Sequence, residues 1–238
     1  MPDILHERRG RIAWTTLNRP QSRNALTFAM YEGLFEEAAR VAADDTVRCW
    51  VITGAGEKAF AAGTDISQFK EFRTGQDALD YETRIDRVLS AVEECPKPVI
   101  AAIAGACTGG GLGIAGVCDL RIAAANARFG VPVARTLGNT LSTMNISRFA
   151  ALIGPARLKD LVFRARLMDA AEALGAGFLS EVVDTPDALE ARAMELAELA
   201  RDVAALGEIC QALGQWAAPR LAQAGQTLDE VFTLLETS

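Results

Sequence analysis

Two segments rich in small residues hold the residue types best suited to catalysis in this chain. Residues 59–66 read AFAAGTDI, and residues 105–113 read GACTGGGLG. Each places small residues and glycine where a predicted strand passes through a loop into a helix, so backbone N–H groups there lack intrachain acceptors. Two such N–H groups that converge form an oxyanion hole, which stabilises negative charge on a carbonyl oxygen. Loss of one donor typically slows a reaction about 10²–10³-fold, so this geometry can account for most of an enzyme's chemistry.

Length and charge exclude several other classes of protein. The 238 residues suffice for one large domain or for a core with a small appendage. Apolar residues make up 50% and charged residues 23%, as in ordinary globular proteins. The net charge of −7 argues against a nucleic-acid partner.

The sequence indicates a cytoplasmic protein. No apolar run reaches the ~18 residues of a membrane span, and the N-terminal residues MPDILHERRGRIAW lack the apolar core of a signal peptide. The five cysteines are an odd number without paired spacing. The cysteine pattern favours reduced thiols in a cytosolic compartment. Because no apolar run is long enough, no membrane association is expected.

The sequence gives weaker support to three other kinds of site. Residues 111–116 fit GxGxxG, but a dinucleotide site needs an acidic residue about 20 positions later, and no Asp or Glu occurs between Leu120 and Lys159. His6 is the only histidine, so a Ser-His-Asp or Cys-His mechanism would need it. The residues around His6, however, indicate a strand at the edge of a sheet. No His/Cys/Asp/Glu cluster has the spacing of metal ligands, so no metal site is expected.

The elements that must position the two loops follow from periodicity. Thr27 is predicted to cap a helix that ends near Ala43, and a second helix is predicted over Ala78–Glu93. A third should begin at the glycines at 109–111. Strands are expected over Ile4–Glu7, Arg11–Leu17, Arg48–Thr53, Val99–Ile103, Leu120–Ala124, Arg128–Phe129 and Leu179–Val183. Alternating strands and helices followed by mostly helices indicate an α/β core with a helical C-terminal portion.

Several longer segments resemble one known family. They are NRPQSRNAL (18–26), residues 44–66, residues 97–132 and LMDAAEALGAGFLSEVV (167–183). In this order they resemble the crotonase superfamily, also called the enoyl-CoA hydratase/isomerase family. The resemblance implies an α/β fold, a crotonase (ClpP-like) spiral of ββα units over residues 1–175, and a helical trimerisation region over residues 176–238. It also implies a homotrimer, or a hexamer built as a dimer of trimers.

The resemblance implies a site for acyl-CoA thioesters and no tightly bound cofactor. The N–H groups of Thr64 and Gly110 would stabilise an enolate-like anion. Asp65 would fix its loop and cap the next turn, and Arg23 would approach the CoA phosphates or else be solvated. The remaining groove positions for coenzyme A would be Ala25, Ala61, Ala62, Gly63 and Ile66.

Two departures from the family pattern argue against ordinary hydration. Family hydratases have glutamates where this chain has Gly113 and Val133, and hydration needs one group to activate water and another to protonate carbon. Gly113, Val133, Arg135 and Asn139 would instead line the acyl pocket. Asp80, Glu82 and Asp86 on the preceding helix are candidate acids or bases, or a solvated helix face. An isomerase, a dehalogenase, a hydrolase and a catalytically silent CoA-binding protein remain open.

Overall fold

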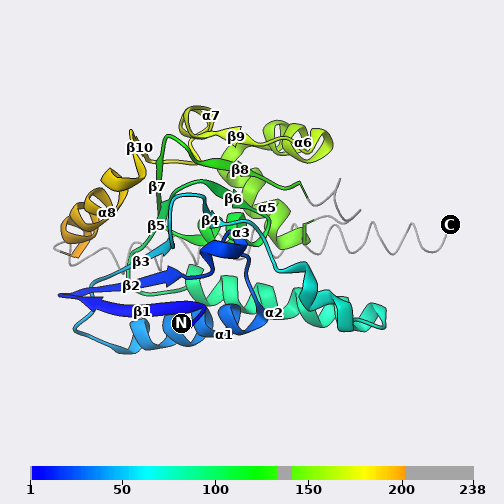
Figure 1. Cartoon of the computed structure of the whole chain (residues 1–238), viewed down its shortest axis with the longest axis horizontal. Coiled ribbons are helices and arrows are strands. Elements are labelled where there is room, and N and C mark those ends of the chain that lie inside the picture. The colour runs from blue at the N-terminus through cyan, green and yellow to red at the C-terminus, as the bar shows by residue number, and fades with distance from the viewer. Residues whose placement is uncertain (1, 133–140, 202–238) are drawn as a thin grey trace.

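The computed structural model describes residues 2–132 and 141–201 (Figure 1). The chain begins with a hairpin of β1 (Ile4–Arg9) and β2 (Ile12–Leu17), followed by the short 3-10 helix η1 (Pro20–Ser22) and by α1 (Phe28–Ala43). The Thr27 side chain accepts a hydrogen bond from the N–H of Met30, so the predicted cap of α1 is confirmed. Helix α1 leads into β3 (Cys49–Gly54), which pairs in parallel with β2.

A strand–strand–helix unit then repeats three times. The units are β3 (Cys49–Gly54), β4 (Ala59–Ala61) and α2 (Gly75–Glu93); β5 (Val99–Ile103), β6 (Ala106–Thr108) and α3 (Gly110–Val117); and β7 (Leu120–Ala124), β8 (Arg128–Gly130) and α5 (Thr143–Ile153). In each unit the first strand joins a six-stranded sheet of order β1-β2-β3-β5-β7-β10, and the second joins a four-stranded sheet of order β4-β6-β8-β9. The 3-10 helix η2 (Ile66–Glu71) connects β4 to α2.

Alternation along the strands builds a core on each face of the six-stranded sheet. Trp50 and Ile52 of β3 belong to the larger cluster, which contains the buried faces of α1 and α2. Cys49 and Val51 point the opposite way, into a smaller cluster that α8 (Pro186–Arg201) covers. Figure 1 shows α1 and α2 side by side on one side of the sheet and α8 on the other.

The remaining elements complete both sheets. They are α6 (Pro155–Arg164), β9 (Met168–Asp169), α7 (Ala170–Gly175), β10 (Glu181–Val183) and α8 (Pro186–Arg201). Strand β10 pairs with β7, and α8 packs against β3, β5 and β7. Residues 176–201 therefore pack onto the same sheet as the N-terminal half. The division at residue 175 and the trimerisation region stay predictions, and residues 202–238 lie outside the described residues.

The predicted elements agree with the observed ones except at short strands and one helix end. Strands β4 and β6, of three residues each, are too short to show a period of two. Helix α2 begins at Gly75 and not at Ala78, because Thr74 and Asp77 form a reciprocal capping box. No helix within residues 2–132 and 141–201 is long and apolar enough to cross a membrane.

Candidate active site

A cavity of about 200 Å³ lies where the β4–η2 loop meets the start of α3. Its main-chain wall is formed by residues 62–64 and 108–110, and its side-chain wall comes largely from α2. The apolar lining side chains are Ile66, Phe69, Ile85, Leu89, Pro132 and Leu141. A mostly apolar cavity with a few convergent polar groups is the usual form of a small-molecule site.

Two backbone N–H groups on this wall have no acceptor among the described residues. The Leu26 N–H donates to the Gly63 carbonyl (2.8 Å), and the Asp65 N–H donates to the Leu26 carbonyl (2.9 Å). These bonds engage Gly63 and Asp65, the two neighbours of Thr64, whereas the Thr64 N–H has no acceptor within residues 2–132 and 141–201. Gly110 is the first residue of α3, so its N–H has no acceptor within the helix.

Close contacts bring residues Thr64 and Gly110 side by side. A Cβ on Gly110 would lie 3.1 Å from Thr64 Oγ1, and one on Gly109 would lie 3.4 Å from the Gly63 Cα. Gly109, at φ 52° and ψ −120°, adopts a conformation that L side chains rarely reach. A Cβ on Gly111 would lie 2.2 Å from the Ala61 carbonyl oxygen. Close packing therefore requires glycine at 111, and the same approach sets Thr64 beside Gly110.

The only two tyrosines of the chain meet at Thr64. Thr64 Oγ1 lies 2.9 Å from the Tyr31 hydroxyl and 2.8 Å from the Tyr81 hydroxyl. Burial raises the pKa of both phenols, so both stay protonated near neutral pH. These three hydroxyls fix the Thr64 side chain and, with it, the orientation of its peptide.

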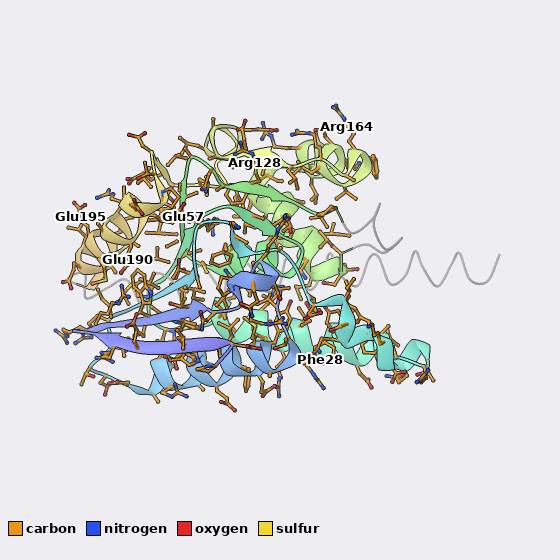
Figure 2. All side chains as sticks on the ribbon, in the orientation of Figure 1. Phe28, Glu57, Arg128, Arg164, Glu190 and Glu195 are labelled. Atoms are coloured by element: carbon orange, nitrogen blue, oxygen red, sulfur yellow. The ribbon has the colours of Figure 1, made fainter. Side chains whose placement is uncertain are left out.

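Sequence analysis did not identify either tyrosine as part of the site. Tyr81 lies four residues before Ile85 on the predicted apolar face of α2, so helical periodicity could have located it. An aromatic cluster of Phe28, Phe69, Phe72 and Tyr81 lies beside the cavity, and its members Phe69 and Tyr81 line it. The ring centroids of Phe69 and Tyr81 are 4.9 Å apart. Phe28 lies at the start of α1 near α2 (Figure 2).

The residues predicted to form the coenzyme A groove lie on two neighbouring segments, only part of which lines the cavity. The Ala62 N–H donates to the Arg23 carbonyl (3.0 Å), which joins residues 23–26 to residues 61–66. The Arg19 guanidinium donates to the Ala25 carbonyl (2.6 Å) and to Asp65 (2.9 Å). Ala62, Gly63 and Ile66 line the cavity, whereas Ala61 is fully buried and Arg23 is exposed outside it.

Asp65 has the capping role expected for it. Its carboxylate accepts from the Ser67 N–H (3.0 Å) at the start of η2. Hydrogen bonds from Ser67, and then from Arg19, lower the Asp65 pKa below its usual value. The carboxylate is therefore ionised and occupied at neutral pH, which suits a structural role.

The candidate acids of α2 have different surroundings. Asp80 is exposed, accepts from Gln76 (2.8 Å) and does not line the cavity. Asp86 accepts a long 3.5 Å hydrogen bond from Ser142, and burial raises its pKa. Glu82 lines the cavity, and burial, with a smaller effect of Asp86, raises its pKa.

The predicted acyl-pocket residues are only partly described. Gly113 lines the cavity, and a Cβ there would lie 3.4 Å from Leu89 Cδ1. Val133, Arg135 and Asn139 lie outside the described residues. Farther along the chain, Ser142 and Asn145 reach the cavity and hydrogen-bond to each other (3.1 Å).

The other chemistries lack support at this site. His6 lies in β1, as predicted, with Nδ1 3.1 Å from Thr15 Oγ1, and it does not line the cavity. Cys107 and Cys118 are fully enclosed, and burial raises both thiol pKa values, so neither is a ready nucleophile. Across residues 2–132 and 141–201, no group of three His, Cys, Asp or Glu side chains could hold a metal ion.

Comparison with known proteins places the chain in one family. The family model described as enoyl-CoA hydratase/isomerase matches residues 7–230. The short-chain-enoyl-CoA hydratase of Clostridium acetobutylicum is 38% identical over 195 residues, which cover 82% of this chain and 74% of that protein. The mitochondrial Delta(3,5)-Delta(2,4)-dienoyl-CoA isomerase of Mus musculus is 34% identical over 192 residues, which cover 76% of this chain and 58% of that protein.

One solved structure is similar to this chain over nearly its whole length. The crystal structure of an enoyl-CoA hydratase/carnithine racemase from Magnetospirillum magneticum superimposes with a TM-score of 0.84 and 34% identity, covering 99% of this chain and 88% of that one. The predicted crotonase fold is thereby confirmed. The chain belongs to the enoyl-CoA hydratase/isomerase family.

Proposed function

We propose that this protein is an acyl-CoA thioester enzyme that stabilises a thioester enolate with the N–H groups of Thr64 and Gly110. The observation that supports it most strongly is that Thr64 and Gly110, whose N–H groups have no acceptor among the described residues, lie side by side on the wall of one cavity. Gly110 begins an eight-residue helix, whose dipole adds positive potential at that N–H.

The substrate fits the composition of the cavity wall. An enolate develops its charge on the thioester oxygen, where the two N–H groups would bind it. The adjoining apolar side chains of Phe69, Ile85 and Leu89 suit an apolar acyl chain. We place coenzyme A along the rim at residues 23–26 and 61–66, with acyl-CoA as substrate and no tightly bound cofactor.

Ordinary hydration is disfavoured by the chain's own residues. Gly113 offers no carboxylate where the resemblance implies one, and the Leu89 side chain occupies the adjoining space. Hydration also needs a second acid or base, and the sequence has Val133 at the other expected position. We therefore favour chemistry through an enolate without addition of water, and relatives named as isomerases are consistent with it.

The second candidate function is a catalytically silent CoA-binding protein. Butanoyl-CoA binding measured by titration calorimetry, together with turnover of crotonyl-CoA and vinylacetyl-CoA, separates the candidates. Binding with isomerisation of vinylacetyl-CoA supports the enzyme proposed here. Binding without any turnover supports the silent protein, and rapid hydration of crotonyl-CoA contradicts the interpretation of Gly113 and Val133.

We further propose a cytoplasmic homotrimer or dimer of trimers that acts in fatty-acid metabolism. Exposed apolar side chains on the described surface, with Phe163 at 81% exposure, are consistent with further burial between subunits. Light scattering coupled to size-exclusion chromatography would test this assembly. A monomer at micromolar concentration would contradict it.

A further inference from the structure

Helix α2 presents one carboxylate to the cavity that has no partner among the described residues. The helix has five acidic residues, and four of them have hydrogen-bond or ion-pair partners. Asp77 accepts from the N–H groups of Arg73 and Thr74, Asp80 from Gln76, Asp86 from Ser142, and Glu93 from Arg148. Glu82 is the fifth, and it forms neither a hydrogen bond nor an ion pair with residues 2–132 or 141–201.

Glu82 shares the cavity with the two unpartnered N–H groups. Glu82, Ile85 and Leu89 follow helical spacing and line one wall, while Thr64 and Gly110 lie on another. The residue before it, Tyr81, hydrogen-bonds to Thr64 Oγ1 (2.8 Å). Glu82 is therefore held on a rigid helix beside the loop that would bind the thioester oxygen.

The surroundings of Glu82 disfavour its charge. Burial, and next the carboxylate of Asp86, raise its pKa above the usual value. Arg148, which pairs weakly with Asp86 (3.9 Å), is engaged more closely by Glu93 (2.7 Å). The phenols of Tyr31 and Tyr81, which line the same cavity, are neutral near pH 7. A half-buried carboxylate without a cation costs stability, and such perturbed groups gather at functional sites.

We propose that Glu82 is the proton-transfer residue of this site, removing a proton from the acyl carbon next to the thioester carbonyl. The inference rests on the enolate function proposed above. When the C–H bond breaks, its electron pair forms the enolate whose oxygen the two N–H groups bind, and the proton passes to a Glu82 oxygen. The protonated Glu82 then returns that proton to a carbon of the acyl group, and the enolate collapses to the thioester.

This step needs no water, oxidant or second acid. Return of the proton to the same carbon exchanges hydrogen with solvent, and return to the γ-carbon of an unsaturated acyl chain moves the double bond. The class of reaction is therefore double-bond migration or proton exchange next to a thioester. A single carboxylate suffices for both, in contrast to hydration.

The test measures deuterium uptake by butanoyl-CoA in deuterium oxide, isomerisation of vinylacetyl-CoA, and butanoyl-CoA affinity. The variants are Glu82→Gln, Glu82→Asp and, as a matched control on an exposed turn of the same helix, Asp80→Asn. Circular dichroism and thermal unfolding show whether each variant is folded. We expect Glu82→Gln to lose about 10²–10⁴-fold in both reactions, with affinity changed less than about threefold, and Asp80→Asn to match the wild type.

The outcomes distinguish a failure of the role of Glu82 from a failure of the enolate function. Folded Glu82→Gln that exchanges deuterium at the wild-type rate overturns the role of Glu82 while leaving the enolate site intact. Wild-type protein that binds butanoyl-CoA but exchanges no deuterium contradicts the enolate function and, with it, the role of Glu82. Wild-type protein that does not bind butanoyl-CoA contradicts the proposed function itself. If Glu82→Gln fails to fold, the Glu82→Asp variant tests the proposal. Its shorter side chain should slow deuterium exchange at least about tenfold with unchanged affinity for butanoyl-CoA. Full activity of Glu82→Asp overturns the proposal.

Discussion

Replacement of Gly110 by alanine tests the close approach on which the site depends. The new Cβ would lie 2.1 Å from the Tyr31 hydroxyl oxygen, against the roughly 3.5–4.0 Å of ordinary contacts. Tyr31 is fully buried and bonded to Thr64, so its hydroxyl would have to move by more than about 1 Å and abandon that bond. Overpacking of about 1–3 kcal/mol, with a lost hydrogen bond of about 0.5–1.5 kcal/mol, gives a destabilisation of roughly 1.5–4.5 kcal/mol.

The measurement is urea unfolding of Gly110→Ala, Tyr31→Phe and the double variant. Because phenylalanine lacks the clashing oxygen, the double variant should recover at least half of the lost free energy of unfolding. Coupling between these neighbours should therefore exceed about 1 kcal/mol. Gly110→Ala as stable as the wild type, or a double variant whose losses simply add, would refute the placement of Tyr31 against Gly110.

Three further predictions concern the hydroxyl cluster, the buried asparagine and the cavity carboxylate. Thr64→Val should lose about 1–3 kcal/mol in urea unfolding because it removes the hydrogen bonds that Thr64 Oγ1 makes with both tyrosine hydroxyls, whereas Thr64→Ser should stay within about 1 kcal/mol; equal losses would contradict the cluster. Asn24→Asp should lose more than about 2 kcal/mol, since the Asn24 amide donates to the Ala55 and Ala59 carbonyls and a carboxylate cannot; an unchanged urea midpoint would refute that role. Glu82→Gln should raise the melting temperature at pH 7–8, because the raised pKa of Glu82 means that its ionised form costs stability once pH has risen through the folded pKa. That gain should vanish near pH 4, below the unfolded value of about 4.3, where the wild-type carboxyl is neutral too; a gain that is independent of pH would contradict it.

Much of this fold could be predicted because its longer elements have clear local patterns. The apolar face of α2 and the capping threonine of α1 are both visible in the sequence, and both were found where expected. The glycines of residues 105–113 also indicate a loop before a helix. The packing role of Gly111 could not be predicted, since it depends on the carbonyl of Ala61, which lies in another strand–strand–helix unit.

The parts that sequence could not predict arise from long-range contacts. Tyr31 and Tyr81 lie on different helices, and only the packing of α1 against α2 brings them to Thr64. Likewise, the five acidic residues on α2 look alike in sequence. Partners such as Ser142 and Arg148 come from a distant part of the chain and distinguish Asp86 and Glu93 from Glu82.

The proposed function depends on two main-chain amides that hold one thioester oxygen. A crystal structure of the protein with butanoyl-CoA measures this directly. The expected result is a carbonyl oxygen about 2.7–3.1 Å from both Thr64 N and Gly110 N, with the neighbouring acyl carbon facing Glu82. A thioester whose oxygen contacts neither amide, or lies in another cavity, would contradict the proposal.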